Sequence, residues 1–222
     1  MTLLIRSVIL DFDSTLVPVE SLEALLLGDG SDPQLASKLD EITRAGMDGS
    51  LPFHTSLEER LRLAQPTRDE AIQLGNTLSE RLTAGAEEAC AAWTQRGIVP
   101  WIVSGGLREI LLPTGARLGI PPERVQGVQL LWHDDGTFRG VNPADPFSTS
   151  KVDGLRALAT APERPAIGVG DGATDRALLE AGLTDGFIVF TRHERRAAVL
   201  VHGDPEASDF GAVQQLVETW TR

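Results

Sequence analysis

The chain has 222 residues, of which 41% are hydrophobic, and a formal net charge of -12 at pH 7. A chain of this size can form one α/β domain with a small insertion, and its acidic balance disfavours nonspecific binding to nucleic acid. We find no secretory leader and no apolar run long enough to cross a bilayer, and the single cysteine, Cys90, cannot form an internal disulfide. These observations predict a cytoplasmic protein that binds neither nucleic acid nor a membrane.

Two carboxylates follow the first predicted strand. Residues 7–10 are an apolar run typical of a buried strand, and the run DFDST follows them at residues 11–15. Asp11 and Asp13 would therefore lie together at the strand's carboxyl end. Like charges repel and burial disfavours both ionised forms, so such a pair usually needs a cation beside it. Taken alone, the run fits equally well a capping turn that leads into a helix.

A helical insertion is predicted after this strand. Apolar residues recur at helical spacing and predict four helices, over residues 21–27, 34–45, 57–64 and 68–82. Thr67 and Glu70 have the spacing of a capping box at the start of the last of these helices. We interpret residues 17–86 as a helical cap that closes over a site and selects the substrate, and residues 1–16 and 87–222 as the α/β core.

The core begins with a strand and a hairpin. Residues 98–103 form an apolar run that ends in Ser104-Gly105-Gly106, and residues 128–141 alternate apolar and polar side chains around the run DDG at 134–136. The alternation predicts a β-hairpin flap beside an otherwise parallel sheet.

Further along, Lys151 opens a predicted helix that ends near residue 159, and the strand candidate 166–169 runs into GDGATD at residues 170–175. Three strands thus end in polar residues and glycine. In an open α/β sheet, ligands bind outside the carboxyl ends of the strands, so the three ends predict one common crevice. The remaining predicted elements are strands over residues 186–190 and 198–201 and a helix over 209–219. The expected fold class is α/β, with a Rossmann-like, mostly parallel sheet.

Together these segments resemble the motifs of the haloacid dehalogenase superfamily and, within it, those of the phosphoserine phosphatases. The resemblance covers about residues 8–187. DFDST is similar to the nucleophile motif of that family, Ser104-Gly105 to its phosphate-binding serine motif, Lys151 to its lone lysine, and residues 170–175 to its metal-binding acidic motif. The resemblance implies a Mg²⁺-dependent enzyme that hydrolyses O-phospho-L-serine to L-serine and phosphate, as in serine biosynthesis.

The resemblance also assigns roles in phosphoryl transfer. Asp11 would attack phosphorus and form an aspartyl-phosphate, which divides one difficult step into two easier ones. Asp13 would protonate the leaving oxygen and later deprotonate the attacking water, for which burial must raise its pKa. Ser104, the backbone N–H of Gly105 and Lys151 would hold the phosphoryl oxygens. Without the resemblance, Lys151 would be interpreted as a solvated surface lysine, because most lysines are exposed.

A magnesium ion is implied beside these residues. Its expected ligands are Asp11, the backbone carbonyl of Asp13, Asp171 and water, because Mg²⁺ prefers hard oxygen ligands. Asp175 would orient Lys151 or a metal-bound water from outside the ligand set.

Recognition of the rest of the substrate is expected from five positions. In the resembling family the glutamate matching Glu20 binds the amino group, the arginine matching Arg60 binds the carboxylate, and apolar residues matching Met47 and Phe53 shape the pocket. Thr174 stands where many relatives have asparagine, and it is a further candidate for substrate binding. By position alone, Glu20 could equally be a solvated acid at the start of a helix. Arg60 could be one member of an exposed charged helix face.

Two other functions stay open at this point. One is a related phosphatase or phosphotransferase acting on another small phosphomonoester, such as phosphoethanolamine or a sugar phosphate. The other is a phosphate-binding or phospho-accepting signalling module without enzymatic activity. Asp13 argues against the module, which has no use for an acid/base beside the acceptor. Glu20 and Arg60 favour phosphoserine, because a sugar phosphate needs neither charge. The expected assembly is a monomer or a homodimer.

Overall fold

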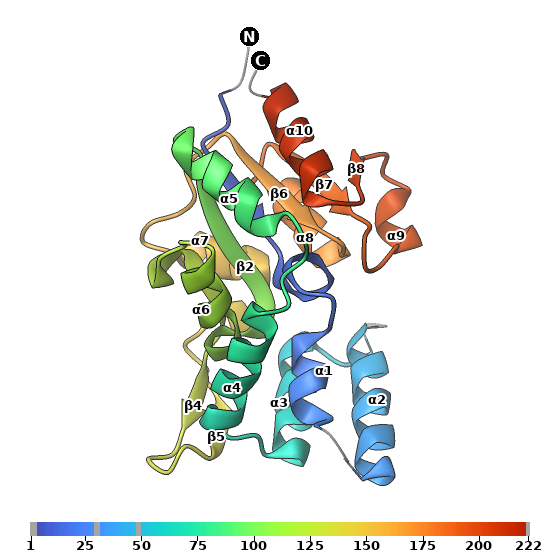
Figure 1. Ribbon diagram of the computed structural model, residues 1–222. Helices are drawn as coiled ribbons and strands as arrows, with labels where there is room; N and C mark the ends of the chain where they lie inside the picture. Colours follow the sequence, from blue (N-terminus) through green and yellow to red (C-terminus); the bar gives the residue numbers. More distant parts are fainter. Residues whose placement is uncertain (1–3, 29–31, 48–49, 221–222) are drawn as a thin grey trace.

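A parallel sheet forms the centre of the computed structural model, which describes residues 4–28, 32–47 and 50–220 (Figure 1). Its order is β3-β2-β1-β6-β7-β8, and every pairing within it is parallel. The strands of this sheet are β1 (Ser7–Leu10), β2 (Val99–Leu107), β3 (Val125–Val128), β6 (Ala166–Gly170), β7 (Gly186–Phe190) and β8 (Glu206–Ala207). The predicted α/β class with a mostly parallel sheet is confirmed.

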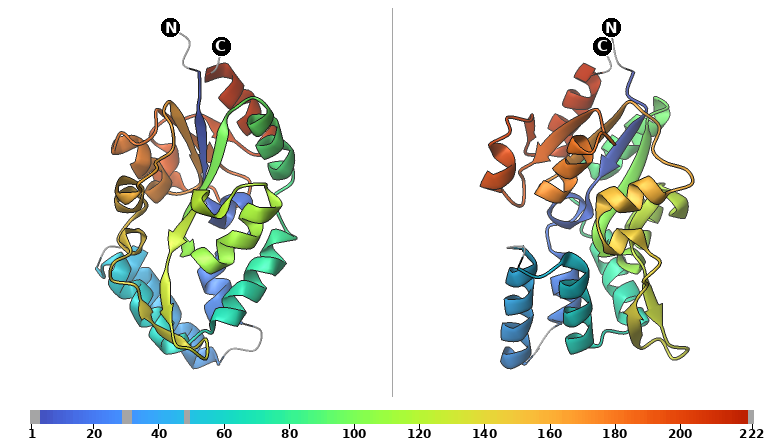
Figure 2. Two further views of the ribbon diagram at one scale, coloured as in Figure 1. Left: turned by 90° about the vertical axis from the view of Figure 1, so that its left-hand side faces the viewer. Right: turned by 180° about the vertical axis from the view of Figure 1, so that it is seen from behind.

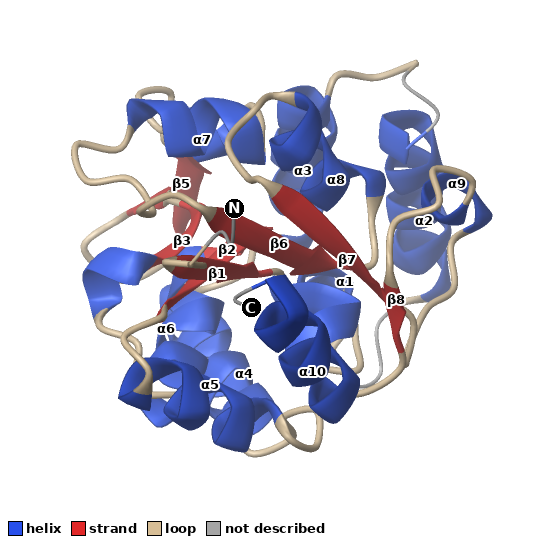
Figure 3. Cartoon of the chain, turned by 90° about the horizontal axis from the view of Figure 1, so that it is seen from above, coloured by secondary structure: helices blue, strands red, loops and turns tan. Residues whose placement is uncertain are grey.

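Helices cover both faces of the sheet, with α7 and α8 on one face and α5, α6 and α10 on the other (Figure 3). β1 serves both layers: Val8 and Leu10 belong to the larger hydrophobic cluster, and Ile9 to a second one that includes Leu155 and Leu178. Both faces of β1 are buried, and this explains why its residues are continuously apolar and do not alternate with polar ones. The core helices are α5 (Ala86–Gln95), α6 (Arg108–Arg117), α7 (Lys151–Ala157), α8 (Ala173–Glu180), α9 (Ala197–Leu200) and α10 (Phe210–Trp220).

The inserted helices and the hairpin lie together at one end of the sheet (Figures 1 and 2). The hairpin tip contacts the start of α4, where Arg68 N donates to the Gly136 carbonyl over 2.9 Å. The predicted capping box is present there, with Glu70 N donating to Thr67 Oγ1 and Thr67 N donating to Glu70 Oε2. The elements of this end are α1 (Ser21–Leu26), α2 (Pro33–Met47), α3 (Phe53–Ala64), α4 (Arg68–Ser79), β4 (Leu130–Trp132) and β5 (Phe138–Val141).

The prediction of a strand over residues 198–201 is wrong, because these residues lie in and just after helix α9. Only Val199 of the run is buried, against Phe187 and Val189, whereas Val201 is 78% exposed. A run this short does not distinguish helix from strand by its periodicity, and the packing partners decide. The edge of the sheet is instead β8, which pairs with β7.

Three short helical turns complete the described part of the chain: η1 (Phe12–Leu16), η2 (Pro122–Arg124) and η3 (Pro146–Ser148). Within that part, no helix has the length and the apolar character needed to span a bilayer.

Candidate active site

Strands β2, β1 and β6 are neighbours at the centre of the sheet. Leu10 of β1 stands level with Ile102 of β2 and with Val169 of β6. Asp11 leaves β1 with its backbone N–H donating to the Val169 carbonyl over 2.9 Å. The ends of β1 and β6 and the middle of β2 therefore lie side by side, and the turn η1 begins directly after Asp11.

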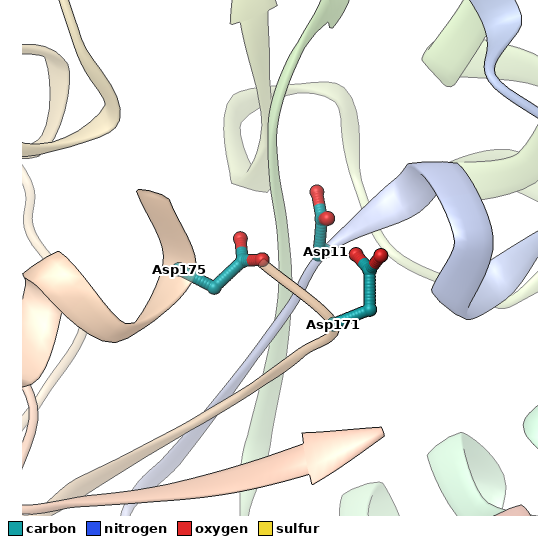
Figure 4. Close-up of side chains that lie close together, drawn as sticks. All are labelled: Asp11, Asp171 and Asp175. Atoms are coloured by element: carbon teal, nitrogen blue, oxygen red, sulfur yellow. The ribbon is translucent and has the colours of Figure 1, made fainter. Parts of the chain in front are cut away.

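Carboxylates of three aspartates converge there. Ligand oxygens of Asp11, Asp171 and Asp175 lie within 4.8 Å of one another, and all three residues are buried. Figure 4 shows the side chains pointing toward one another from the end of β1, the loop after β6 and the first turn of α8. Such a group of negative charges requires a cationic neighbour.

Lys151 supplies one positive charge to this group. It is the first residue of α7, which Ser150 caps by accepting a hydrogen bond from Asp153 N. Its Nζ lies 2.6 Å from Asp11 Oδ1 and 2.5 Å from Asp175 Oδ1. Lys151 is only 7% exposed, so the alternative of a surface lysine is excluded.

Burial acts in opposite directions on the pKa values of Asp11 and Lys151, because it disfavours the charged form of each. Burial raises the pKa of Asp11 well above its ordinary range, and the charge of Asp175 adds to this although Lys151 opposes it. Burial alone would lower the pKa of Lys151, but Asp11 and Asp175 more than offset it, and the lysine's pKa is raised. The ammonium is therefore permanently charged beside the carboxylates.

Asp13 lies on the turn after Asp11 and is held by the start of the cap, since Ser21 N donates to Asp13 Oδ1 over 2.9 Å. Burial, followed by the charge of Glu20, raises the pKa of Asp13 to about 7. A carboxyl group with that pKa exchanges a proton at neutral pH, which is what an acid/base group needs.

Gly106 allows three polar side chains to approach one another. A Cβ on this residue would lie 3.1 Å from Ser21 Oγ, 3.3 Å from Ser104 Oγ and 3.5 Å from Asp13 Oδ2. Ser104 Oγ also accepts a hydrogen bond from Gly106 N over 3.0 Å. The Ser104 hydroxyl and the Asp13 carboxyl group thus both lie beside Gly106 on β2.

The donor set fits a hard divalent cation. Asp11 and Asp171 contribute carboxylate oxygens, the ligands that Mg²⁺ prefers. Asp175 is already engaged, with Oδ1 on Lys151 and Oδ2 accepting from Gly172 N over 3.0 Å. The role expected for Asp175, to orient Lys151 or a metal-bound water, stays a prediction.

The positions expected to recognise the substrate are spread over the cap and the core. Glu20 is the residue directly before α1 and accepts a hydrogen bond from Ser14 Oγ over 2.9 Å. The ring of Phe53 extends toward β2, with Cζ 3.7 Å from the place where a Cβ on Gly105 would stand. Thr174 is exposed in the first turn of α8. Met47 ends α2, and its side chain lies outside the described part of the structure.

Arg60 is buried between the cap helices and not on an exposed charged face. It is 6% exposed, and its Nη1 lies 2.8 Å from Glu23 Oε1 and 3.3 Å from Thr43 Oγ1. It borders a cavity of about 90 Å³ that Glu23, Asp40 and several leucines also line. Burial lowers the pKa of Arg60, and the charge of Glu23 opposes this.

Sequence reasoning missed Arg196 and Glu23. Arg196 Nε lies 2.6 Å from Asp171 Oδ2, and its Nη2 lies 2.9 Å from Glu20 Oε1. No motif marks Arg196, because the loop between β7 and α9 brings it back to the site only in three dimensions. Glu23 could have been found, since it follows Glu20 by one helical turn and faces the same side of α1.

The fold and the site define a class of protein. Paired aspartates at the end of a buried strand, with a buried lysine and a serine beside glycine, are typical of α/β hydrolases that transfer phosphoryl groups to an aspartate. Comparison with known proteins agrees: residues 8–180 match the family described as haloacid dehalogenase-like hydrolase.

The sequence relatives are more specific. A phosphoserine phosphatase of Rattus norvegicus is 32% identical over 173 residues, which cover 76% of this chain and 75% of that protein. A chloroplastic phosphoserine phosphatase of Arabidopsis thaliana is 31% identical over 203 residues, covering 90% of this chain and 68% of that protein. The chain therefore belongs to the haloacid dehalogenase superfamily and, within it, to the phosphoserine phosphatase family.

A solved structure agrees with this assignment. The phosphoserine phosphohydrolase-like protein of Francisella tularensis subsp. tularensis superimposes with a TM-score of 0.85 at 31% identity. The match covers 96% of this chain and 99% of that one. The resemblance thus extends over the cap as well as the sheet.

Proposed function

We propose that this chain is a Mg²⁺-dependent phosphoserine phosphatase that hydrolyses O-phospho-L-serine through an aspartyl-phosphate. The observation that carries the proposal is the position of Asp11, which stands at the converging strand ends with a buried lysine on Oδ1. The phosphoserine phosphatases among its relatives support the choice of substrate.

In the proposed first step Asp11 attacks phosphorus and the serine oxygen leaves. Ser104, the backbone N–H of Gly105 and Lys151 bind the equatorial oxygens, where negative charge is concentrated in the transition state. Asp11, the carbonyl of Asp13 and Asp171 would hold Mg²⁺, which when bound screens the repulsion between the carboxylate and the phosphate.

Asp13 is proposed as acid in the first step and as base in the second. With a pKa of about 7 it holds a proton in a large fraction of molecules at neutral pH. It gives this proton to the serine oxygen, and the resulting carboxylate then takes a proton from the water that hydrolyses the aspartyl-phosphate. A signalling module that stores its phosphoryl group would not benefit from such a residue.

For the amino-acid part of the substrate we propose Glu20 as the partner of the ammonium and Arg60 as a partner of the carboxylate. Phe53, Met47 and Thr174 would border the same pocket. Cytoplasmic serine biosynthesis is the proposed setting, with the protein acting as a monomer or a homodimer.

A kinetic panel tests the substrate. The purified protein with Mg²⁺ is assayed on L-phosphoserine, phosphoethanolamine and a sugar phosphate, and kcat/KM is expected to be highest for L-phosphoserine. The alternative, a related phosphatase for another small phosphomonoester, predicts that one of the other substrates gives the highest value. That result would overturn the assignment while leaving the phosphoryl chemistry in place.

A further inference from the structure

Arg196 lies between Asp171, a proposed metal ligand, and Glu20, the residue that precedes the first inserted helix. Its Nε is 2.6 Å from Asp171 Oδ2, and its Nη2 is 2.9 Å from Glu20 Oε1. The side chains of Arg196 and Glu20 are 33% and 47% exposed, so a solute can reach both. One guanidinium therefore connects the metal-binding loop to the residue proposed for the substrate's ammonium.

This arginine retains unused donors. Arg196 uses Nε for Asp171 and one N–H of Nη2 for Glu20. Among the residues that the structure describes, its Nη1 has no hydrogen-bond partner. A guanidinium has five N–H groups in a planar fork and can bind a further carboxylate through two of them.

We propose that Glu20 and Arg196 together bind the amino-acid head group of the substrate, with Arg196 donating to its carboxylate. This inference rests on the proposed phosphoserine phosphatase function and adds a residue that determines its specificity. In phosphoserine the ammonium and the carboxylate are attached to one carbon, so the groups that bind them must be neighbours. Glu20 and Arg196 are in direct contact and carry the two required charges.

Charge balance favours the same assignment. Arg196 is hydrogen-bonded to two carboxylates, those of Asp171 and Glu20, and the charge of Glu194 acts on it without a hydrogen bond. When Asp171 holds a divalent cation and Glu20 holds the substrate's ammonium, both acids have other counter-ions, and the charge of Arg196 is left for a carboxylate. Arg60 differs, because Glu23 already balances it inside the cap. A carboxylate has enough lone pairs to accept from more than one arginine, so the proposed role of Arg60 and that of Arg196 are tested separately.

The test compares Arg196→Ala with wild type on L-phosphoserine and on phosphoethanolamine, which lacks the carboxylate. The ratio of the two kcat/KM values is expected to fall by about tenfold or more, the size associated with losing one hydrogen bond to a charged group. Arg196→Lys keeps the charge without the fork and should restore part of the ratio. Arg195→Ala is the matched control, since Arg195 is the neighbouring residue and pairs with Glu206 away from the site.

A binding measurement removes the dependence on turnover. Calorimetry with inorganic phosphate and Mg²⁺ present is expected to give a weaker Kd for L-serine in Arg196→Ala and an unchanged Kd for ethanolamine. Titration of each variant with Mg²⁺ alone reports any separate effect through Asp171. If the alanine variant does not fold, the same rate and binding measurements are made on Arg196→Gln, which removes the charge but keeps a long polar side chain.

Several outcomes would overturn the inference. Equal losses for both substrates would mean that Arg196 only positions Asp171, and equal gains would mean that it competes with the ammonium for Glu20. An unchanged ratio in Arg196→Ala together with a collapsed ratio in Arg60→Ala would assign the carboxylate to Arg60 alone. Failure of the proposed function itself looks different, because wild type would then not prefer L-phosphoserine.

Discussion

The buried ammonium group of Lys151 forms ion pairs with two aspartates, Asp11 and Asp175, for which different roles are proposed. Lys151 contacts Asp11 and Asp175 at nearly the same distance, 2.6 and 2.5 Å. Asp175 keeps its other oxygen on Gly172 N, so it acts as an anchor for the lysine. Asp11 has no such hydrogen bond on its other oxygen in the described part of the chain, and in the proposed mechanism that oxygen attacks phosphorus.

Replacement of Asp11 tests the covalent step. In Asp11→Asn the amide cannot form the aspartyl-phosphate, so kcat should fall by at least about 10⁴-fold. Circular dichroism should show an unchanged fold, since asparagine has nearly the same volume. Substantial turnover by the folded, Mg²⁺-saturated variant would contradict the covalent mechanism.

The pKa of Asp13 predicts a pH dependence. Burial and the charge of Glu20 raise it to about 7, so the proton needed by the leaving serine oxygen is present below that pH and lost above it. We expect kcat/KM for L-phosphoserine to fall by about tenfold per pH unit above this pKa, the limit for loss of one proton. An activated aryl phosphate, whose leaving group needs no proton, should lack this descending limb. Identical profiles for the two substrates would argue against Asp13 as the acid.

Replacement of Asp13 separates its two roles. Asp13→Asn should slow both steps on L-phosphoserine, but on an activated aryl phosphate only the second step needs the missing group. Phosphoenzyme should then accumulate and be trapped by acid quench. A variant that traps no more phosphoenzyme than wild type under these conditions would show that another group activates the water.

At the scale of elements, the cap is joined to the core by a close helix crossing. A Cβ on Gly75 of α4 would lie 2.6 Å from the carbonyl oxygen of Ile110 in α6. Backbone cannot move aside as a flexible side chain can, so α4 and α6 approach this closely at residue 75 because it has no side chain. This crossing lies beside the hairpin, whose tip also contacts α4.

Gly75→Ala tests that crossing. Alanine favours the helix by up to about 1 kcal/mol, but the overpacked contact should cost about 1–3 kcal/mol. We expect a net loss in the free energy of unfolding, measured with urea, and a lower kcat/KM because the cap is displaced. Asn76→Ala, the exposed neighbour on the same helix, is the control and should not destabilise the protein. Equal stability of the two variants would mean that the helices can separate without cost.

At the scale of the whole molecule, negative charge is concentrated where the sheet, the cap and the loop after β7 meet. The chain carries a net charge of -12, and three buried aspartates add their repulsion at one point. Lys151 and Arg196 offset part of this repulsion. A divalent cation held by Asp11 and Asp171 would offset more of it, which links activity and stability to the same ion.

Metal removal tests this link. Exhaustive treatment with EDTA should abolish turnover and lower the Tm, and added Mg²⁺ should restore both. In Asp171→Asn the rise in Tm on adding Mg²⁺ should be smaller, because one proposed ligand has lost its charge. Full activity after complete metal removal would rule out the proposed role of Asp171.

The sequence by itself determined the α/β class, the inserted helices, the hairpin and four strands of the sheet, β1, β2, β6 and β7, and it supplied the proposed reacting groups. Strand ends and motif residues are local features: apolar runs record burial on both faces, and Asp11, Ser104, Lys151 and Asp171 follow such runs or open a helix. Parallel strands bring their carboxyl ends to one edge, so Asp11, Ser104 and Asp171 could be placed together from the sequence. Lys151 opens a helix, and only the family resemblance placed it beside them.

Only the tertiary structure decided which charges are paired and which apolar runs are buried. Arg60 is balanced by Glu23, and Arg196 reaches Asp171 and Glu20 from a loop far along the chain. The run at residues 198–201 lies in and just after a helix, in which Val199 is buried and the partly buried Leu200 packs against the same cluster. These outcomes depend on contacts between segments distant in sequence, and neither periodicity nor motif spacing carries that information.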